Sequence, residues 1–149
     1  MEKNKVVLLV SGGLDSTIAY KYLLHFDKEV LPLFINYKGR YTNKEWAACR
    51  YLYGKELHVD DSLNFEKFEI GEKGFIKNRN AHFALIASNY GEKICMAGLK
   101  DDNVGDKSPE AFIKMENLLN TINPEMNGTY SVFSPFWNKE KADIIEYFS

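Results

Sequence analysis

The residues best suited to chemistry are Ser11–Ser16, which read Ser-Gly-Gly-Leu-Asp-Ser and follow an apolar run, Lys5–Val10. Two glycines let a backbone turn sharply and let a ligand approach the main chain closely. A helix that starts directly afterwards adds free N–H groups and a partial positive charge, which favour an anion. The hydroxyls of Ser11 and Ser16 add further donors. These residues therefore predict a phosphate-binding loop. A plain strand-to-helix turn capped by serine or aspartate is the alternative.

Two common phosphate motifs do not fit this loop. A Walker loop needs Gly-Lys-Ser or Gly-Lys-Thr, and the dinucleotide fingerprint needs a third glycine. Neither is present after Gly13. If the loop binds phosphate, it is thus a phosphate site of another kind.

Cationic side chains mark other loops. Lys38, Arg40 and Lys44 fall within seven residues after a second apolar run, in a chain whose formal net charge is −2. Such a local positive loop fits an anionic small substrate better than a polymer. Arg79 and Lys139 are expected near strand ends, where each would stabilise phosphate or carboxylate charge. Solvated surface charge is the alternative for all five.

The elements that position these loops alternate between strand and helix. Strands are predicted at Lys5–Val10, Val30–Tyr37, Glu56–Val59, Phe65–Ile70, Lys93–Ala97 and Ser131–Phe133. Helices are predicted from Ile18 to Phe26, from a Thr42/Glu45 capping box to Gly54, from Asn80 to Tyr90, after Ser108-Pro109-Glu110, and over Lys139–Phe148. Such alternation predicts a parallel sheet, whose ligands bind beyond the carboxyl ends of the strands.

Composition narrows the classes of protein. A length of 149 residues with 45% hydrophobic and 27% charged residues predicts one globular domain, 1–149. A pI near 5.9 argues against a general nucleic-acid binder. The sequence shows no apolar run long enough for a membrane helix and no signal peptide, so a cytoplasmic protein is expected. Cys49 and Cys95 are expected in the core, Trp46 and Trp137 are interpreted as packing residues, and no zinc site is expected.

Ser11–Ser16 resembles the pyrophosphate loop of the N-type ATP pyrophosphatases, the PP-loop superfamily. The resemblance implies a doubly wound parallel α/β sheet of about five strands, in the Rossmann-like adenine nucleotide alpha hydrolase (HUP-type) fold. It also implies cleavage of ATP between the α and β phosphates, with magnesium as cofactor. Nucleotide-binding residues would be Ser11, Gly12, Gly13, Leu14, Asp15, Ser16 and Gly98. Asp15 would hold magnesium, or would simply cap the first helix.

Further segments, in the right order, resemble the 7-cyano-7-deazaguanine synthase (QueC) family. They are Asn36–Tyr41 with Glu45, Arg79-Asn80, Gly98–Asp102 with Asp106 and Ser108-Pro109-Glu110, and Ser134-Pro135-Phe136 with Lys139 and Ile144. The last set resembles the family's Pro…Lys-x-x-Ile stretch. Tyr41 stands where the family commonly has histidine. The family also continues into a cysteine-rich zinc segment, for which the two cysteines here supply no ligands, so the chain resembles a short form.

The QueC resemblance implies a carbon–nitrogen ligase with an adenylated intermediate. Its substrates would be 7-carboxy-7-deazaguanine, ATP and ammonia, and its product 7-cyano-7-deazaguanine, for queuosine or another deazapurine modification of nucleic acid. Arg79, Lys139 and Asp106 would be catalytic. Substrate binding would involve Tyr37, Arg40, Asn80, Asp106 and Glu110. Of these, Asp106 or Glu110 would accept hydrogen bonds from the N1–H and 2-amino edge of the substrate. For Glu110, a charge in the first turn of a helix is the better interpretation.

Other activities remain open. One is another PP-loop adenylating reaction, such as sulfur transfer to tRNA or a different amide ligation. Another is a non-catalytic ATP-binding remnant. Small molecules are the expected partners, without direct contact with nucleic acid or membrane, and a homodimer is left open.

Overall fold

The chain folds around a five-stranded parallel sheet in the order β3-β2-β1-β6-β7. The computed structural model describes residues 4–71, 75–102 and 105–148. The strands are β1 (Lys5–Leu9), β2 (Glu29–Ile35), β3 (His58–Asp60), β6 (Lys93–Cys95) and β7 (Ser131–Phe133). The predicted doubly wound parallel sheet is confirmed.

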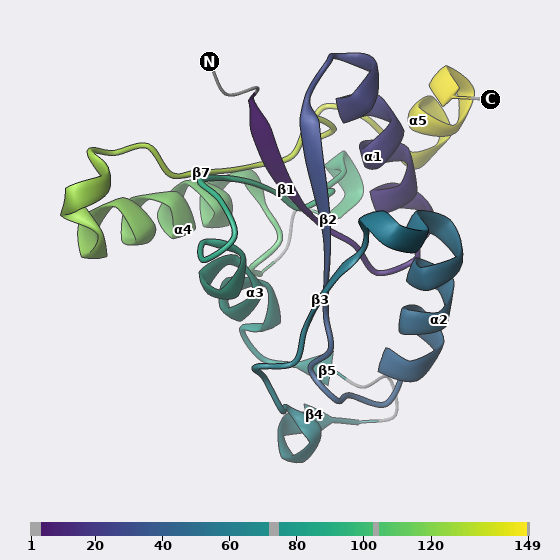
Figure 1. Ribbon diagram of the computed structural model, residues 1–149, viewed down its shortest axis with the longest axis horizontal. Helices are drawn as coiled ribbons and strands as arrows, with labels where there is room; N and C mark the ends of the chain where they lie inside the picture. The colour runs from purple at the N-terminus through teal and green to yellow at the C-terminus, as the bar shows by residue number, and fades with distance from the viewer. Residues whose placement is uncertain (1–3, 72–74, 103–104, 149) are drawn as a thin grey trace.

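Helices cover both faces of the sheet (Figure 1). On one face lie α1 (Leu14–His25), α2 (Thr42–Tyr53) and α5 (Lys141–Phe148). On the other lie α3 (Arg79–Ala87) and α4 (Pro109–Ile122). Short 3₁₀ turns occupy Gly54–Glu56, Glu66–Phe68, Lys100–Asp102 and Pro124–Met126. No helix in these described ranges combines the length and apolarity that crossing a bilayer requires.

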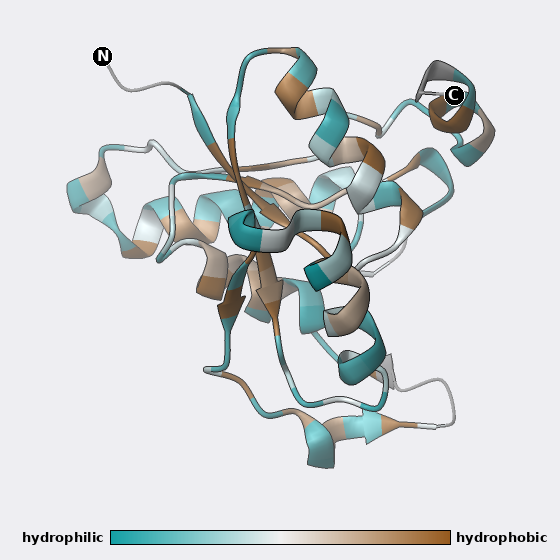
Figure 2. Cartoon of the chain, turned by 45° about the vertical axis from the view of Figure 1, so that its right-hand side comes forward, coloured by the Kyte–Doolittle hydropathy of each residue, from teal (hydrophilic) through white to brown (hydrophobic). Residues whose placement is uncertain are grey.

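β1 lies at the centre of the sheet and is buried on both sides. Val7 packs into the cluster that contains α3 and α4, and Val6 and Leu8 pack into the cluster that contains α1 and α2. Successive side chains of a strand point to opposite faces, so a strand covered on both faces must be apolar throughout. Figure 2 shows these apolar strands between the helical layers.

The order of the strands determines where a ligand can bind. From β1 the chain moves through β2 to β3 on one side, and it returns to the other side of β1 with β6 and β7. The loops that follow β1 and β6 therefore diverge to opposite faces, which opens a crevice at the carboxyl end of β1. Ser11–Ser16 lies at this switch point.

Local details differ from the sequence prediction at two places. Thr42 does not cap α2: it is the first helical residue, and its Oγ1 donates to the carbonyl of Gly39 at 2.7 Å. The predicted strand Phe65–Ile70 is mostly a 3₁₀ turn, and its end, β4 (Glu69–Ile70), pairs antiparallel with β5 (Phe75–Ile76). By contrast the predicted serine cap of α4 is confirmed, because Ser108 Oγ accepts the Ala111 N–H at 3.0 Å.

A buried carboxylate joins β3 to the segment after α3. Asp60 Oδ2 accepts from the Tyr90 hydroxyl at 2.6 Å, and Asp60 Oδ1 accepts from the Ser62 N–H at 2.9 Å. Burial by itself raises the pKa of Asp60, but these hydrogen bonds outweigh it and the pKa lies below its ordinary value. Folding therefore stabilises the ionised form of Asp60 relative to its protonated form.

We expect Tyr90→Phe to destabilise the protein by about 1–3 kcal/mol at pH 7, the range for a hydrogen bond to a charged group. Because the pKa of Asp60 is lowered on folding, this contribution is full above the ordinary aspartate pKa and is lost as pH falls through the lowered value. Urea unfolding of both proteins at pH 7 and pH 3 measures the difference. If the two proteins differ equally in their free energy of unfolding at both pH values, the destabilisation comes from lost packing and not from the hydrogen bond to Asp60.

Candidate functional site

The loop between β1 and α1 has a backbone that glycine alone suits. Gly12 has φ of +80°, and a Cβ built there would lie 2.7 Å from the Cβ of Ala48 in α2. Gly13, in contrast, has no left-handed φ, and the nearest atom to its Cβ position is Ser11 Oγ at 3.4 Å. Gly12 therefore both turns the chain and lets α2 pack against the loop.

Hydroxyl groups close the loop on itself. Ser16, which is buried, donates from Oγ to the Gly13 carbonyl at 3.3 Å and accepts the Ser11 N–H at 3.5 Å. Thr17 Oγ1 donates to the same carbonyl at 2.7 Å. The first helical amide bond runs from the Thr17 N–H to Gly13 O. The amides before Thr17 belong to the helix's first turn, where N–H groups have no partner within the helix.

This loop borders a pocket of about 320 Å³ at the carboxyl ends of β1, β2 and β6. Its charged lining consists of the cations Arg79, Lys107 and Lys141 and the acids Asp15 and Glu45. The three cations come from separate segments: α3, the residue before the cap of α4, and the first residue of α5. A helix N-terminus that faces three cations is suited to a ligand carrying several negative charges.

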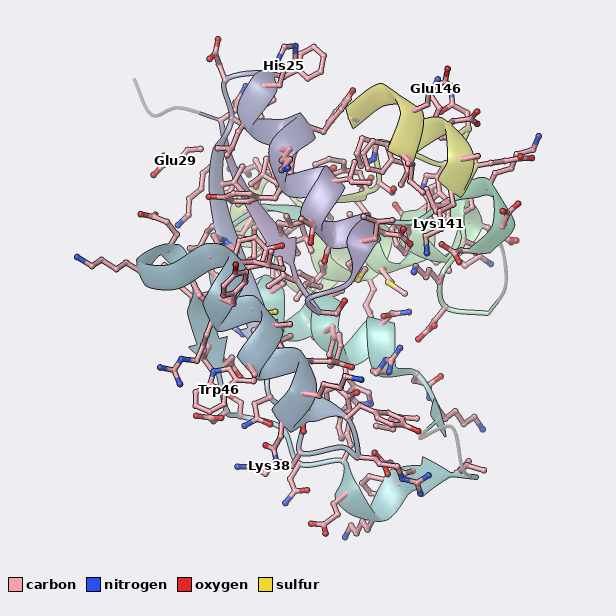
Figure 3. The ribbon with its side chains drawn as sticks, turned by 90° about the vertical axis from the view of Figure 1, so that its right-hand side faces the viewer. His25, Glu29, Lys38, Trp46, Lys141 and Glu146 are labelled. Atoms are coloured by element: carbon pink, nitrogen blue, oxygen red, sulfur yellow. The ribbon has the colours of Figure 1, made fainter. Side chains whose placement is uncertain are left out.

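Lys141 reaches the phosphate loop directly. Its Nζ lies 3.6 Å from Asp15 Oδ1, and Figure 3 shows it at the start of α5, beside the start of α1. Asp15 Oδ1 is buried and has no hydrogen-bond partner. A buried carboxylate oxygen that accepts no hydrogen bond, and whose ion pair with Lys141 can be exchanged, is a suitable ligand for Mg²⁺, which usually combines one or two carboxylates with substrate phosphates. In the described ranges, no three His, Cys, Asp or Glu side chains group into a metal site of their own.

Arg79 is held against two aromatic rings. Its Cζ lies 5.8 Å from the centroid of Tyr37 and 6.0 Å from that of Phe83, and the two rings are 5.5 Å apart. Tyr37 is buried, and its pKa is raised by that burial and by the charge of Glu45, with Arg79 acting in the opposite direction. These cation–π contacts hold the guanidinium at the wall of the pocket.

Of the residues predicted to bind the substrate, Tyr37 and Asn80 line the pocket. Asp106 does not: its carboxylate accepts from the Asn80 N–H at 2.8 Å and from Asn80 Nδ2 at 3.1 Å. It thereby satisfies an amide at the start of α3 and orients Asn80. Its predicted role in substrate binding and catalysis would have to be exerted through Asn80.

Three other predicted residues lie away from the pocket lining. Glu110 is on the exposed first turn of α4 and pairs with Lys114 at 3.6 Å. Arg40 pairs with Glu69 at 3.9 Å, and its N–H donates to the same carboxylate. Lys139 is exposed beside a second, mainly apolar pocket that Tyr22, Phe26 and Phe136 help to line.

Gly98 is predicted to bind the nucleotide, and the structure gives it a packing constraint. A Cβ there would lie 2.3 Å from the ring of Trp137, while its neighbours Met96 and Ala97 line the pocket. Ser134 Oγ accepts the Gly98 N–H at 2.8 Å and donates to the Gly98 carbonyl at 2.7 Å. Gly98 therefore lets β6 and the segment after β7 approach each other behind the pocket.

The sequence did not identify Lys107 and Lys141 as residues of the site, and it gave Glu45 no role in binding a ligand. The Lys-x-x-Ile spacing fits Lys141 and Ile144, so that motif pointed to Lys141 and not to Lys139. Lys107 precedes the α4 cap and carried no motif; in the structure it pairs with Asp102 at 3.4 Å. Glu45 was assigned to a helix cap that does not form.

Two other predictions have clear outcomes. Cys49 and Cys95 are buried in the core, as expected, and burial raises the pKa of Cys49 to about 12 and that of Cys95 further. The interpretation of Trp46 as a packing residue is wrong, because its side chain is 39% exposed, with the Arg50 guanidinium 5.0 Å from its ring. Figure 3 shows Trp46 on the outer side of α2.

Comparisons with known proteins agree with this arrangement. The chain is 28% identical to 7-cyano-7-deazaguanine synthase 1 of Desulfitobacterium hafniense, over 98% of this chain and 76% of that protein. It is 29% identical to the 7-cyano-7-deazaguanine synthase of Thermoplasma acidophilum, over 97% of this chain and 73% of that one. The match to the synthase of Saccharolobus solfataricus, at 28% identity, spans 39% of that longer protein.

A search of protein families gave no matching model. Among solved structures, the fold is similar to a predicted subunit of tRNA methyltransferase from Methanocaldococcus jannaschii, with a TM-score of 0.68 and 17% identity, over 96% of this chain and 73% of that one. That likeness supports the HUP-type α/β fold. By its sequence along nearly the whole chain, the protein resembles the 7-cyano-7-deazaguanine synthases of the PP-loop superfamily.

Proposed function

We propose that the protein is an ATP-dependent ligase that adenylates 7-carboxy-7-deazaguanine and uses ammonia to convert it to the amide and then to the nitrile. The observation that carries this proposal is the Ser11–Ser16 loop, which opens on a pocket with cations from three separate segments. The names of the relatives suggest the substrate class, and the cations that line the pocket beside the loop support binding of a polyanion.

In the first step, a carboxylate oxygen of the acceptor attacks the α-phosphorus of ATP, and pyrophosphate leaves. The loop amides would hold the pyrophosphate, while Lys141 and Lys107 would offset its growing charge. Arg79, fixed by Tyr37, would stabilise the α-phosphate or the acceptor carboxylate. Bringing two anions together against their repulsion is the main work of such a site.

In the second step, ammonia attacks the acyl adenylate, so that the amide forms and AMP and a proton leave. The amide oxygen then attacks a second ATP, again releasing pyrophosphate. Loss of AMP and a proton from that intermediate leaves the nitrile. Each half of the reaction therefore uses the adenylation site once, and the full conversion uses it twice.

Asp15 would hold magnesium together with the phosphate oxygens, since its Oδ1 has no hydrogen-bond partner. The metal would neutralise phosphate charge. Lys141 would then exchange its contact with Asp15 for one with the phosphates.

The test is to incubate the protein with ATP, magnesium, ammonium and 7-carboxy-7-deazaguanine and to follow the products by mass spectrometry. We expect AMP, pyrophosphate, the amide and the nitrile, with two ATP consumed per nitrile. ATP binding without AMP formation from this acid would contradict the proposal and favour a nucleotide-binding remnant.

Sulfur transfer to tRNA, the other adenylating activity considered, finds less support. Nucleophilic sulfur chemistry needs a thiolate. Burial raises the pKa of both Cys49 and Cys95, and both are enclosed in the core, which keeps them as thiols.

A further inference from the structure

Glu45 is a carboxylate that the pocket leaves without a partner. It projects from α2 into the pocket lining. None of the ion pairs or hydrogen bonds found among the described residues involves this carboxylate. Burial raises its pKa above the ordinary value, with Arg79 acting in the opposite direction. A partly buried carboxylate of this kind loses hydration that a ligand's donors can replace.

The other carboxylates near the site are already engaged. Asp15 contacts Lys141 at 3.6 Å, Asp102 contacts Lys107 at 3.4 Å, and Asp106 accepts two hydrogen bonds from Asn80. Glu110 is exposed and pairs with Lys114. Among the carboxylates that line the pocket in the described part of the chain, Glu45 is thus the one with neither an ion pair nor a hydrogen bond.

The surroundings of Glu45 suit a planar, neutral donor edge better than a cation. Tyr37 and Phe83 present aromatic rings 5.5 Å apart in the same wall, and aromatic faces suit a flat heterocycle. The Arg79 guanidinium already lies over both rings and opposes the rise in the pKa of Glu45, so it would repel a second cation there. A phosphate directly beside Glu45 is disfavoured for the opposite reason, because the ionised carboxylate repels an anion.

We infer that the Glu45 carboxylate accepts hydrogen bonds from the N1–H and 2-amino edge of the acceptor's ring and so selects a guanine-like acid over its analogue without the amino group. A carboxylate has two oxygens in a plane, which complements two adjacent donors. The inference rests on the proposed function, and it moves the edge-reading role from Asp106 or Glu110 to Glu45.

The experiment compares two acids, 7-carboxy-7-deazaguanine and the same compound without its 2-amino group. The initial rate of pyrophosphate release with ATP, magnesium and saturating ammonium reports adenylation under turnover, because without ammonia the adenylate would not be discharged. We expect the parent protein to prefer the amino compound by about 10–100-fold in kcat/KM, the value of one hydrogen bond to a charged group. Glu45→Gln should reduce this ratio to below about threefold and leave the KM for ATP unchanged.

Two further variants sharpen the result. Glu45→Asp keeps the charge on a shorter stem and should restore part of the discrimination. Glu110→Gln alters an exposed acid outside the pocket and should leave the ratio as in the parent. Circular dichroism and thermal melts verify that each variant is folded.

An unchanged ratio in folded Glu45→Gln overturns the inference. So does a variant whose only defect is a raised KM for ammonium, or lost discrimination of ATP from its 2′-deoxy form, because these would place Glu45 at ammonia or at the ribose. If the parent protein releases pyrophosphate with neither acid, the proposed function fails, and the inference fails with it.

Discussion

Lys141→Met is expected to lower ATP-dependent pyrophosphate release by about 10²–10³-fold, the usual cost of removing one group that stabilises transition-state charge. Lys141 lines the pocket and lies 3.6 Å from Asp15 Oδ1 in the phosphate loop. Methionine keeps most of the length and the apolar stem of lysine but removes the charge. Steady-state pyrophosphate release at saturating ATP measures the effect.

Lys139→Met is the matched control, because it makes the same change two residues away. Lys139 is exposed and borders the second pocket. We expect its rate to stay within about twofold of the parent, as surface changes away from a site usually have small effects. The assignment of Lys139 as catalytic in the sequence analysis makes the opposite prediction. A large loss in Lys139→Met with a normal rate in Lys141→Met would contradict the placement of α5.

Gly12→Ala is expected to destabilise the protein by about 2–4 kcal/mol, combining a left-handed backbone with overpacking. Its φ is +80°, and the new methyl group would lie 2.7 Å from the Cβ of Ala48. For a chain of this size the melting temperature should fall by about 5–15 °C. ATP affinity should fall as well, because α2 and the phosphate loop must separate to admit the methyl group.

Gly13→Ala provides the comparison within the same loop. Its backbone is not left-handed, and the nearest atom would be Ser11 Oγ at 3.4 Å, an ordinary contact. We expect its melting temperature to change by less than about 3 °C. Scanning calorimetry of both variants measures the difference. Equal shifts in the two variants would contradict the description of Gly12 as the constrained position.

The fold was largely predictable because its signals are local. The apolar run of β1 indicates a strand that is buried on both faces, and Ser108-Pro109 indicates the capped start of helix α4. The β4–β5 hairpin was missed because each of its strands has two residues, too few for a period to appear. Thr42 was misassigned because its hydroxyl bonds back to Gly39, a choice that depends on the path of the preceding loop.

The candidate site was predictable only in part. The Ser11–Ser16 loop is contiguous in the chain, so its sequence alone predicts phosphate binding. Glu45, Lys107 and Lys141 meet it only through the tertiary fold. A carboxylate such as Asp106 looks free in the sequence, yet the fold commits it to Asn80. Which acid remains available is a property of packing and hydrogen bonding, and no spacing in the sequence reveals it.

The central claim is that the loop directs attack of an acceptor carboxylate on the α-phosphorus of ATP. It is tested most directly with 7-carboxy-7-deazaguanine labelled with ¹⁸O in its carboxylate. Adenylation followed by ammonia attack predicts that each AMP released carries one ¹⁸O, which is two per nitrile formed, and that pyrophosphate stays unlabelled. Label in inorganic phosphate together with ADP, or AMP without label, would contradict the account.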